Sequence, residues 1–513
     1  MILKRMNMKS KIKYCMCTIA GALSIMTSCT NKDQMANVQN ESKDWPIIVR
    51  KGDKLYEGDK EFRFMSFAAP NIQQNESQIR EDKSNRFPDE YEIRDILSGL
   101  QRVGGRATRT FSLSVFSPED DGMPVYIEGK RQYNEEAFQC LDRILAYAPE
   151  YDVRIIIPFI ASQRFAGIRG VDEFAALSGK TEVGAFWTDP EVKEDFKHFL
   201  SFLLNRVNTV TNKPYKEDPA ILGWQFGNEF GSFYGDRKLP GKEWSPKIWQ
   251  WCKEMGAYIK SIDSNHLLIE AGGVNRDSVL ADPNIDVISD HLYEYWSGMG
   301  TQLSPMAKRT MEQCRGKKPV MIDEFGLGTT ENLRELMKTI REEGIVGGLM
   351  WSMRGHRRDG GWYYHNEGGT FVNSFHVPGF AAGTVYEERR LLDLVKKEAY
   401  LLRGEVAPAP EKPAPAPVLM RQGNGFTWRG STGAACYTME RAESENGPWT
   451  VIAIGLDDSV IADVKSFEFT KEASEPLVLF YDENKVDGKK YYYRIKGENE
   501  SGSSEYSNVL LVE

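Results

Sequence analysis

The central part of the chain alternates short apolar runs with longer amphipathic stretches. Runs such as Val153 to Ile160 and Ile221 to Phe226 have the length and composition of strands that are buried on both faces. Between them lie stretches with the apolar spacing of helices, and Pro190 at the head of one suits a first helical turn. Alternating strands and helices of this kind predict a parallel sheet covered by helices.

Eight strands are predicted before residue 404. They span residues 62–69, 107–115, 153–160, 221–226, 267–271, 287–290, 320–323 and 347–351, and helices are predicted at 88–103, 135–147, 190–207, 248–262, 306–314, 331–343 and 386–402. This order predicts an α/β fold, a (β/α)₈ TIM barrel with loop insertions, over residues 45–404. A doubly wound open sheet is the competing architecture, but no glycine-rich phosphate turn follows the first strand.

The pattern changes in the last hundred residues. Residues 405–417 are rich in proline and predict a semi-rigid linker. Residues 418–513 have short alternating runs, turn pairs such as Asn446-Gly447 and no helical pattern, which predicts a small all-β sandwich of the immunoglobulin or fibronectin type. The run Y-Y-Y-R-I-K-G-E-N-E-S-G-S-S-E-Y-S-N resembles the last strands of fibronectin type III domains. Trp428 and Tyr492 are predicted core residues, and a supporting role for this domain is favoured over sugar binding.

The first residues predict targeting rather than folded structure. A basic segment precedes a short apolar core, Tyr14 to Met26, which ends in M-T-S-C. This ending resembles the lipobox of bacterial lipoproteins, and the resemblance implies that residues 1–28 are a signal peptide and that Cys29 carries lipid. Residues 29–44 are then a flexible tether, and the protein is expected at the outer membrane of a bacterial envelope, on its periplasmic or outer side. A plain secretory signal with an incidental cysteine is the alternative.

Charge and cysteine usage limit the partners. The net charge of -9 argues against nucleic-acid binding, which needs a basic face. Four further cysteines (Cys140, Cys252, Cys314 and Cys436) are scattered without a metal-binding spacing, and Cys140 and Cys252 are predicted to be small buried residues. No metal and no organic cofactor are therefore expected, and the chain is expected to be a monomer.

Two carboxylates end two of the predicted strands. Residues Ile221 to Phe230 read I-L-G-W-Q-F-G-N-E-F, so Glu229 follows the fourth strand, and V-M-I-D-E-F-G places Glu324 at the end of the seventh. The carboxyl ends of barrel strands share one rim, where active sites lie. Such a pair hydrolyses a glycosidic bond when one group donates a proton and the other attacks the sugar carbon. Retention of configuration requires a separation of about 5–5.5 Å.

These motifs resemble a known family. Asn-Glu after the fourth strand and Glu-Phe-Gly in the seventh are similar to glycoside hydrolase family 5, and the stretch from Phe186 to Glu229 resembles its endo-β-1,4-mannanases. F-A-G-I-R-G-V-D-E-F after the third strand strengthens this resemblance. It implies that Glu229 is the acid/base, that Glu324 is the nucleophile, and that mannan-type polysaccharides or oligosaccharides are the substrates.

The resemblance also implies substrate-binding residues. Asn228 is expected to bind the sugar 2-hydroxyl, Arg109 to orient Glu324, and Tyr293 of the His-x-Tyr motif to lie near the nucleophile together with His291. Trp351, at the end of the eighth strand, is expected beneath the sugar. Taken singly, Arg109 also fits an ion pair at a strand end, His291 a core histidine, and Trp351 a residue that plugs the barrel.

Two segments depart from the family pattern. Phe230-Gly231-Ser232 follows Glu229 where the family has proline, so the leaving-group side of the cleft is expected to differ, with specificity beginning at Phe230. The loop after the eighth strand holds Arg354, Arg357, Arg358 and Trp362, which either contact substrate or form a solvated cover. An exo-β-mannosidase, a β-1,4-glucanase and a non-catalytic carbohydrate-binding lipoprotein therefore stay open as alternatives.

Overall fold

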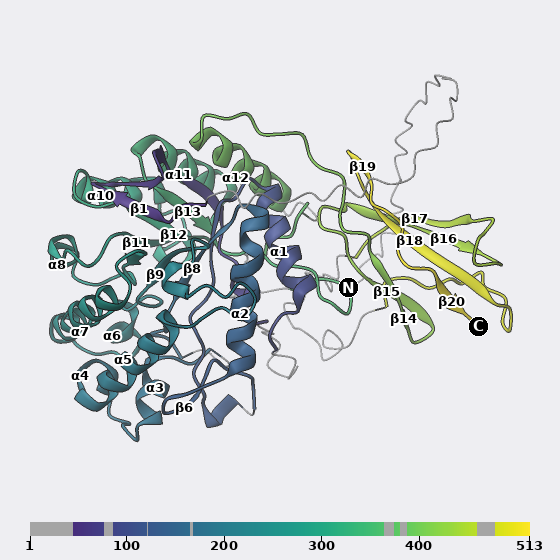
Figure 1. Cartoon of the computed structure of the whole chain (residues 1–513). Helices are drawn as coiled ribbons and strands as arrows, with labels where there is room; N and C mark the ends of the chain where they lie inside the picture. The colour runs from purple at the N-terminus through teal and green to yellow at the C-terminus, as the bar shows by residue number, and fades with distance from the viewer. Residues whose placement is uncertain are drawn as a thin grey trace, which may run out of the picture. The chain divides into compact units, whose positions relative to one another are not determined.

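The architecture is given by a computed structural model (Figure 1). It describes residues 45–75, 86–120, 122–164, 168–363, 374–379, 387–458 and 478–513. The predicted signal peptide, the tether and Cys29 lie outside the described residues. The description below concerns one compact unit, Pro46–Glu513.

Eight parallel strands form a closed barrel. They are β4 (Phe64–Phe67), β5 (Ala107–Arg109), β8 (Arg154–Pro158), β9 (Ile221–Gln225), β10 (Leu267–Ile269), β11 (Ile288–Tyr293), β12 (Val320–Gly326) and β13 (Gly347–Met350). Two four-stranded sheets contain them, in the orders β5-β8-β9-β10 and β11-β12-β13-β4. A parallel bridge between Ile269 and Val287 joins the sheets at one seam. At the other, Ala69 N donates to Arg109 O at 2.9 Å, so the predicted (β/α)₈ barrel is confirmed.

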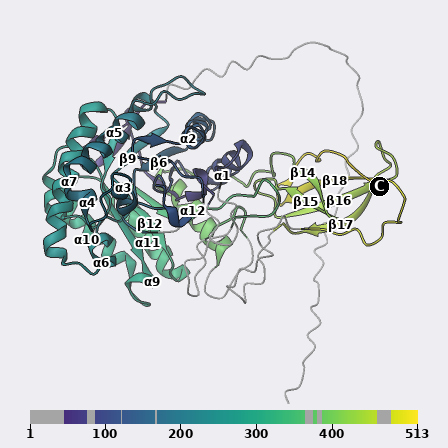
Figure 2. The ribbon, with the colours of Figure 1, turned by 90° about the horizontal axis from the view of Figure 1, so that it is seen from below.

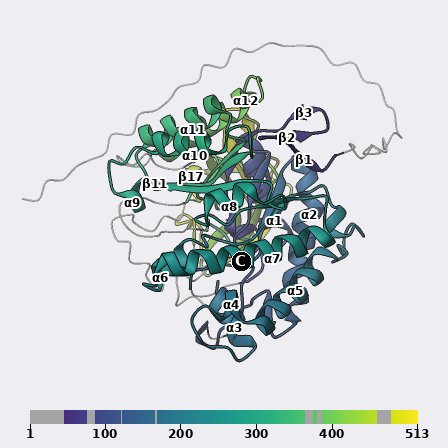
Figure 3. The same cartoon turned by 90° about the vertical axis from the view of Figure 1, so that its left-hand side faces the viewer.

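Helices surround the strands (Figure 3). The long ones are α1 (Glu90–Arg102), α2 (Glu135–Tyr147), α5 (Pro190–Leu204), α7 (Gly241–Ile262), α10 (Leu303–Cys314), α11 (Thr330–Glu343) and α12 (Glu388–Leu402). Shorter ones are α3 (Val171–Leu177), α4 (Ala185–Thr188), α6 (Ser232–Asp236), α8 (Arg276–Ala281) and α9 (Glu294–Ser297). A capping box of Asp89 and Glu92 starts α1. None of the described helices combines the length and the apolar character needed to cross a membrane.

A three-stranded antiparallel sheet that the sequence pattern did not predict precedes the barrel. It consists of β1 (Ile48–Lys51), β2 (Lys54–Glu57) and β3 (Lys60–Glu61). Ile48 and Leu55 are buried in one cluster with the barrel residues Leu222 and Met321. This small sheet therefore covers the apolar interior of the barrel, which closed barrels of this size fill with side chains. A small hairpin, β6 (Ile127–Gly129) with β7 (Gln132–Tyr133), lies between β5 and α2.

Strand β11 runs further than predicted and carries functional candidates. It extends to Tyr293, so His291 and Tyr293 lie within the strand and not after it. A register shift between Asp290 and His291 places His291 opposite Glu324 of β12. The second strand, by contrast, ends at Arg109 and not near residue 115. These differences at strand ends determine which side chains meet at the rim.

The residues after α12 contain strands and, where described, no helix. They are β14 (Val418–Gln422), β15 (Gly425–Arg429), β16 (Cys436–Ala442), β17 (Thr450–Leu456), β18 (Tyr491–Asn499), β19 (Gly502–Ser503) and β20 (Leu510–Val512). One antiparallel sheet pairs β14 with β15, and a second contains the other five, of which β16, β17 and β18 lie side by side in Figure 2. A separate apolar cluster joins residues of both sheets. An all-β domain with its own core is therefore present.

The alternation of β18 corrects one predicted core residue. Trp428 is fully buried, as predicted. Tyr491, Tyr493 and Ile495 point into the same core, whereas Tyr492 lies on the opposite face and is only half-buried. The three consecutive tyrosines give no apolar alternation from which the sequence could fix the inward face. The prediction for Tyr492 was wrong by one residue.

Cys140 and Cys252 are buried, as expected.

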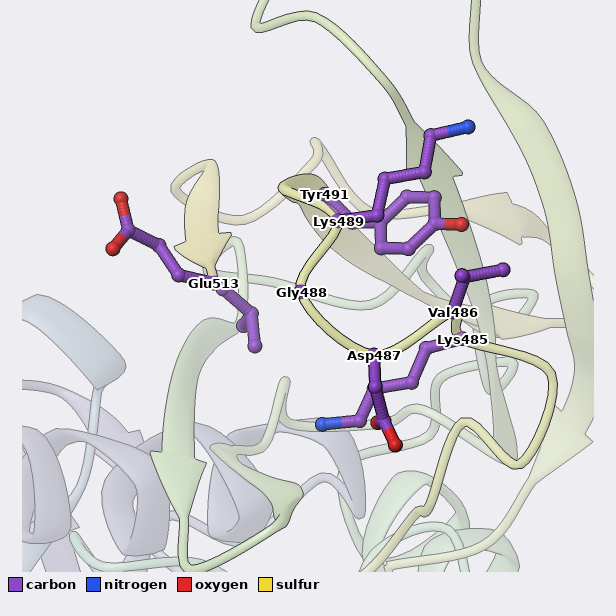
Figure 4. A pocket seen from close by; sticks show the side chains of 8 residues that line it. Lys485, Val486, Asp487, Gly488, Lys489, Tyr491 and Glu513 are labelled. Carbon is purple, nitrogen blue, oxygen red and sulfur yellow. The ribbon is translucent and has the colours of Figure 1, made fainter.

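A small hollow lies in this all-β domain (Figure 4). Its cavity volume is about 40 Å³, and its lining includes Lys485, Lys489, Tyr491 and Glu513. Sites for small organic ligands typically measure about 300–1,000 Å³, whereas a volume of this size holds only a few waters. The hollow gives no support to a glycan site.

Candidate active site

Every predicted site residue of the barrel lies at the carboxyl end of a strand. Arg109 ends β5, His291 and Tyr293 end β11, Glu324 lies in β12, and Asn228 and Glu229 follow β9. Trp351 comes directly after β13 and shares a buried cluster with Tyr293 and Phe111. The rings of Trp351 and Phe111 have centroids 5.7 Å apart. The strands thus bring together side chains that are up to 242 positions apart in the sequence, from Arg109 to Trp351.

The two carboxylates approach each other closely enough for retaining chemistry. One oxygen of Glu229, one of Glu324 and a ring nitrogen of His291 are all within 4.8 Å of one another. Inverting enzymes keep their carboxyl groups about 6.5–9.5 Å apart to admit a water, and retaining enzymes about 5–5.5 Å. The Glu229 side chain is 32% exposed and that of Glu324 only 6%. Glu229 therefore faces the open mouth, and Glu324 lies deeper.

Arg109 fixes the floor of the site. This fully buried guanidinium donates to Glu324 Oε1 at 2.6 Å, to Asn228 Oδ1 at 2.7 Å and to Gln225 Oε1 at 2.6 Å. A guanidinium presents its donors in one rigid plane, so three acceptors from the ends of two strands, β9 and β12, are held in a fixed arrangement. Asn228 Nδ2 in turn donates to Gln163 Oε1 at 3.2 Å, and the amide carries a second N–H.

Glu324 accepts hydrogen bonds on both oxygens. The Tyr293 hydroxyl donates to Oε2 at 2.7 Å while Arg109 donates to Oε1. Burial raises the pKa of Glu324, the negative charge of Glu229 adds to this, and Arg109, His291 and Tyr293 reduce the rise without cancelling it. Its geometry is nevertheless that of an oriented nucleophile, because each carboxylate oxygen accepts a hydrogen bond that fixes the direction of the group.

Glu229 is held from the loops after β8 and β9. Its backbone has a positive φ of 48°, an uncommon conformation for a residue with a side chain. Ser162 Oγ donates to its carbonyl oxygen at 2.7 Å, and Gln163 Nε2 donates to Oε2 at 2.6 Å. Burial by itself raises the pKa of Glu229, but the hydrogen bond and charge of His291, together with Arg109, hold it below the usual value.

His291 lies between the carboxylates. Nδ1 is 2.8 Å from Glu229 Oε1 and 3.4 Å from Glu324 Oε2, and Nε2 is 3.6 Å from Asp323 Oδ1. Burial alone would lower the pKa of His291, but the charges of Glu324 and Asp323 and the bonds to its neighbours raise it well above its usual value. The ring is therefore a cation at neutral pH, and the free protein keeps a proton between Glu229 and Glu324.

Four residues of this network did not emerge from the sequence as candidates: Ser162, Gln163, Gln225 and Asp323. Gln225 Nε2 and Ser289 Oγ each donate to Asp323 at 2.7 Å, behind the His291 ring. Gln225 carried a signal, since it is a polar residue inside an otherwise apolar strand. Asp323 stood beside Glu324 in the same motif. Gln163 lies in a loop, and no local pattern in the sequence distinguishes it.

The same cluster has the donor atoms of a metal site. Glu229, His291 and Glu324 offer two carboxylates and an imidazole, which suit zinc or a similar divalent ion. Both oxygens of Glu324 already accept bonds from Arg109 and Tyr293, however. A buried cation 2.6 Å from a ligand oxygen also repels a metal ion. The donor set fits a proton-transfer cluster better than a metal site.

Phe230 does not face the cleft. It is fully buried, and its ring packs against Trp187 and Trp251 with centroids 4.7 and 5.7 Å away. The expectation that specificity begins at this side chain is therefore wrong, because aromatic packing behind the loop occupies it. Ser232, two residues further on, does contact the proposed acid/base, with its Oγ 3.4 Å from Glu229 Oε2.

The basic loop after β13 is not the solvated cover that was one of the two expectations for it. Arg354 and Trp362 are buried. The indole N–H of Trp362 donates to Asp458 of the all-β domain at 3.2 Å. The Arg358 carbonyl accepts a bond from Arg429 at 2.7 Å. Much of this loop therefore faces the C-terminal domain.

Comparisons with known proteins agree with this geometry. Residues 166–343 match a family model described as GH family 5 beta-mannosidase-like. A mannan endo-1,4-beta-mannosidase of Solanum lycopersicum is 30% identical over 232 residues, covering 38% of this chain and 55% of the relative. A mannan endo-1,4-beta-mannosidase of rice is 24% identical over 368 residues, covering 60% of this chain and 89% of the relative.

A solved structure shares the fold. The endo-1,4-beta-mannanase from Rhizomucor miehei is superposed with a TM-score of 0.54 at 21% identity, covering 70% of this chain and all of that one. A likeness at this identity establishes the barrel architecture. The chain spans about half the length of the tomato relative.

Proposed function

We propose that the protein is a retaining glycoside hydrolase that cleaves β-1,4-mannosidic bonds in mannan-type polysaccharides or oligosaccharides. The observation that carries this proposal is the pair of carboxylates after β9 and in β12, whose facing oxygens lie within 4.8 Å of each other across the barrel mouth. The match of residues 166–343 to a mannosidase-like family model supports the choice of substrate.

The reaction proceeds in two displacements. In the first, Glu324 attacks the anomeric carbon to form a glycosyl ester, while Glu229 gives a proton to the departing glycosidic oxygen. In the second, Glu229 takes a proton from a water, which attacks the same carbon and releases Glu324. Glu229 is the more exposed of the two groups, as a residue that meets the leaving group and then water must be.

The other predicted residues have consistent roles in this scheme. Arg109 and Tyr293 hold the two oxygens of Glu324, so that the attacking lone pair has a fixed direction. His291 holds a proton 2.8 Å from Glu229 and supplies it for the acid step. Asn228, held by Arg109, presents an amide N–H for the sugar 2-hydroxyl, and Trp351 provides an apolar face beneath the ring.

Two features outside the barrel complete the proposal. The basic and apolar segments before Cys29 support a lipid anchor at that cysteine, and hence a position at the outer membrane of a bacterial envelope. The strand order and separate core of residues 418–513 support a fibronectin type III-like sandwich.

Hydrolysis of defined glycans tests the function. The protein is incubated with mannan, glucomannan, cellulose and short manno-oligosaccharides, and the products are separated over time. Release of mixed oligosaccharides from mannan, with the first product in the β-anomeric form by NMR, is the expected result. Release of mannose alone would identify an exo-acting enzyme, and cleavage of cellulose alone a glucanase. No cleavage of any of them would reject the proposal in favour of a binding protein.

A further inference from the structure

The loop after β13 begins at the proposed substrate platform, and residues 358 and 362 within it contact the C-terminal domain. Its first part is tied to the barrel, because Met353 N donates to Ala68 O at 2.8 Å. Beyond it, the side chain of His356 is 1% exposed, although it lies in a loop rich in charged residues. A buried histidine in a loop needs partners that hold it there.

Those partners come from two different parts of the molecule. Nδ1 of His356 is 2.9 Å from Asp95 Oδ1 of α1, and Nε2 is 3.3 Å from Asp458 Oδ2 of the C-terminal domain. The backbone N–H of His356 donates to Asp95 Oδ2 at 2.7 Å. Burial alone would lower the pKa of His356, but the two carboxylates raise it to about 9. A buried imidazolium therefore links α1, the loop after β13 and the C-terminal domain.

Further contacts surround this ion pair. The Trp362 ring lies against His356, with ring centroids 3.5 Å apart, and its indole N–H bonds Asp458. Thr432 Oγ1 donates to Asp95 at 2.6 Å, and the Tyr91 hydroxyl donates to Gly430 O at 2.9 Å. These bonds run from the C-terminal domain to both the loop and α1.

Glycines on both sides allow the close approach. A Cβ on Gly430 would lie 2.1 Å from His356 Nε2, and one on Gly360 would lie 1.9 Å from Thr427 Oγ1. Gly360 also has a φ of +103°, which side-chain-bearing residues rarely adopt. The two surfaces therefore fit only because neither position carries a side chain.

The proline-rich segment before the domain is also tied down. Arg102 of α1 donates to the carbonyls of Glu411 and Lys412 at 3.2 and 3.0 Å. Asn499 of β18 donates to the Glu411 carbonyl at 2.7 Å. A linker bonded to both neighbours does not act as a free spacer between them.

We propose that the C-terminal domain positions the substrate platform of the barrel, with His356 and Asp458 as positioning residues that act on Trp351 through the loop between them. The domain is thus a part of the catalytic unit and not a separate glycan-binding module. This inference rests on the proposed function, in which Trp351 lies beneath the sugar.

Asp458→Asn is the decisive variant, because it removes one charge from the buried pair and keeps the shape of the side chain. Asp482→Asn is the matched control. Asp482 is also buried in the C-terminal domain, and it accepts bonds from Arg441 at 2.7 Å and from the Tyr493 hydroxyl at 2.9 Å, both within that domain. Each variant loses a charge-assisted contact, but only the first loses one to the loop.

Kinetics on a manno-oligosaccharide are measured in the full-length chain well below the melting temperature. For Asp458→Asn we expect KM to rise roughly three- to tenfold with kcat within about twofold, because a loosened platform weakens substrate binding. For Asp482→Asn we expect both constants to stay within about twofold of wild type, with a lower Tm. An unchanged KM in Asp458→Asn, or an equal rise in both variants, would overturn the proposal.

Hydrogen exchange gives a second measurement that needs no substrate. Peptides covering residues 351–363 are expected to exchange faster in Asp458→Asn and at the wild-type rate in Asp482→Asn. Equal exchange in all three proteins would overturn the positioning role. If wild type cleaves no mannan, the proposed function fails, and the exchange data still decide whether the domain fixes the loop.

Discussion

Nδ1 of His291 lies 2.8 Å from Oε1 of Glu229. This contact determines where the proton of the site resides, because the neighbouring carboxylates keep the imidazole charged and its charge in turn lowers the pKa of Glu229. Glu324 has the opposite shift, upward, mainly from burial. In the free protein the proton therefore lies on the histidine and not on the proposed acid.

Replacing His291 by Asn should narrow the pH profile. The cation lowers the pKa of both Glu229 and Glu324, so its removal raises both. The acid limb of kcat/KM reports ionisation of the nucleophile, and the alkaline limb reports loss of the proton that serves the acid step, which His291 holds in wild type and only Glu229 can hold in the variant. In a profile measured from pH 4 to 9, the acid limb is expected to shift to higher pH, and the alkaline limb to lower pH because a carboxyl group releases this proton more readily than an imidazolium whose pKa is raised.

Tyr293→Phe is the companion variant for this test. The lost hydroxyl bonds Glu324 and lowers only that pKa, so the acid limb should rise while the alkaline limb stays. Movement of both limbs by Tyr293→Phe, or of neither by His291→Asn, would contradict the assignment of the proton to His291.

Glu324→Ala and Glu229→Gln should both be nearly inactive on mannan, but for different reasons. Loss of the nucleophile prevents formation of the ester, and loss of the acid leaves the leaving group unprotonated, which costs roughly 10²–10⁴-fold. An aryl β-mannoside with an acidic phenol does not need the proton. Glu229→Gln should therefore give a burst of phenol from this substrate, and Glu324→Ala none. A burst from Glu324→Ala would show that Glu324 is not the nucleophile.

Gln163 should matter to activity although it was not identified from the sequence. Gln163→Met keeps the volume but removes the bond to Glu229 Oε2 and the acceptor for Asn228. A hydrogen bond to a charged group contributes about 1.5–3 kcal/mol, so kcat/KM should fall on the order of tenfold or more. Gln163→Glu places a second carboxylate beside Glu229 and should raise the alkaline limb. A profile unchanged in both variants would rule out this positioning role.

Glu270, at the carboxyl end of β10, should make stability depend on pH. Burial raises its pKa to about 7, although Arg276 lies 3.4 Å away. Since the folded pKa exceeds the unfolded one, the free energy of unfolding is highest below about pH 4.5, where Glu270 is protonated in both states. It falls as pH rises through 7, because the buried carboxyl must then ionise. Glu270→Gln should therefore raise the free energy of unfolding at pH 8 by up to about 3 kcal/mol and leave it similar at pH 5.

Urea unfolding at pH 5 and pH 8 checks this result. Glu254→Gln is the control, because Glu254 forms a partly exposed ion pair with Lys193 on the barrel surface. Such pairs contribute little, so this variant should lie within about 1 kcal/mol of wild type at both values. A gain in Glu270→Gln that is equal at both pH values would show that the carboxyl does not titrate as described.

The sequence by itself determined the order of strands and helices and the positions of the two carboxylates. Apolar runs of strand length, each followed by an amphipathic stretch, are a local property, so β9 and β12 were predicted to within a few residues. Glu229 and Glu324 could be assigned to one rim because parallel strands in a barrel all end on the same side. The family resemblance then predicted Arg109, Asn228, His291, Tyr293 and Trp351 at the same rim, where the structure places them.

Only the tertiary structure decided which side chains touch. Gln163 reaches Glu229 because two loops meet, and the register shift in β11 brings His291 opposite Glu324. The inward face of β18 depends on its pairing with β16, which consecutive tyrosines do not encode. His356 lies in a loop whose sequence allowed either substrate contact or a solvated cover, and only folding surrounds it with Asp95 and Asp458 from distant parts of the chain. Periodicity is written along the chain, whereas contacts between distant segments arise only when the whole chain packs.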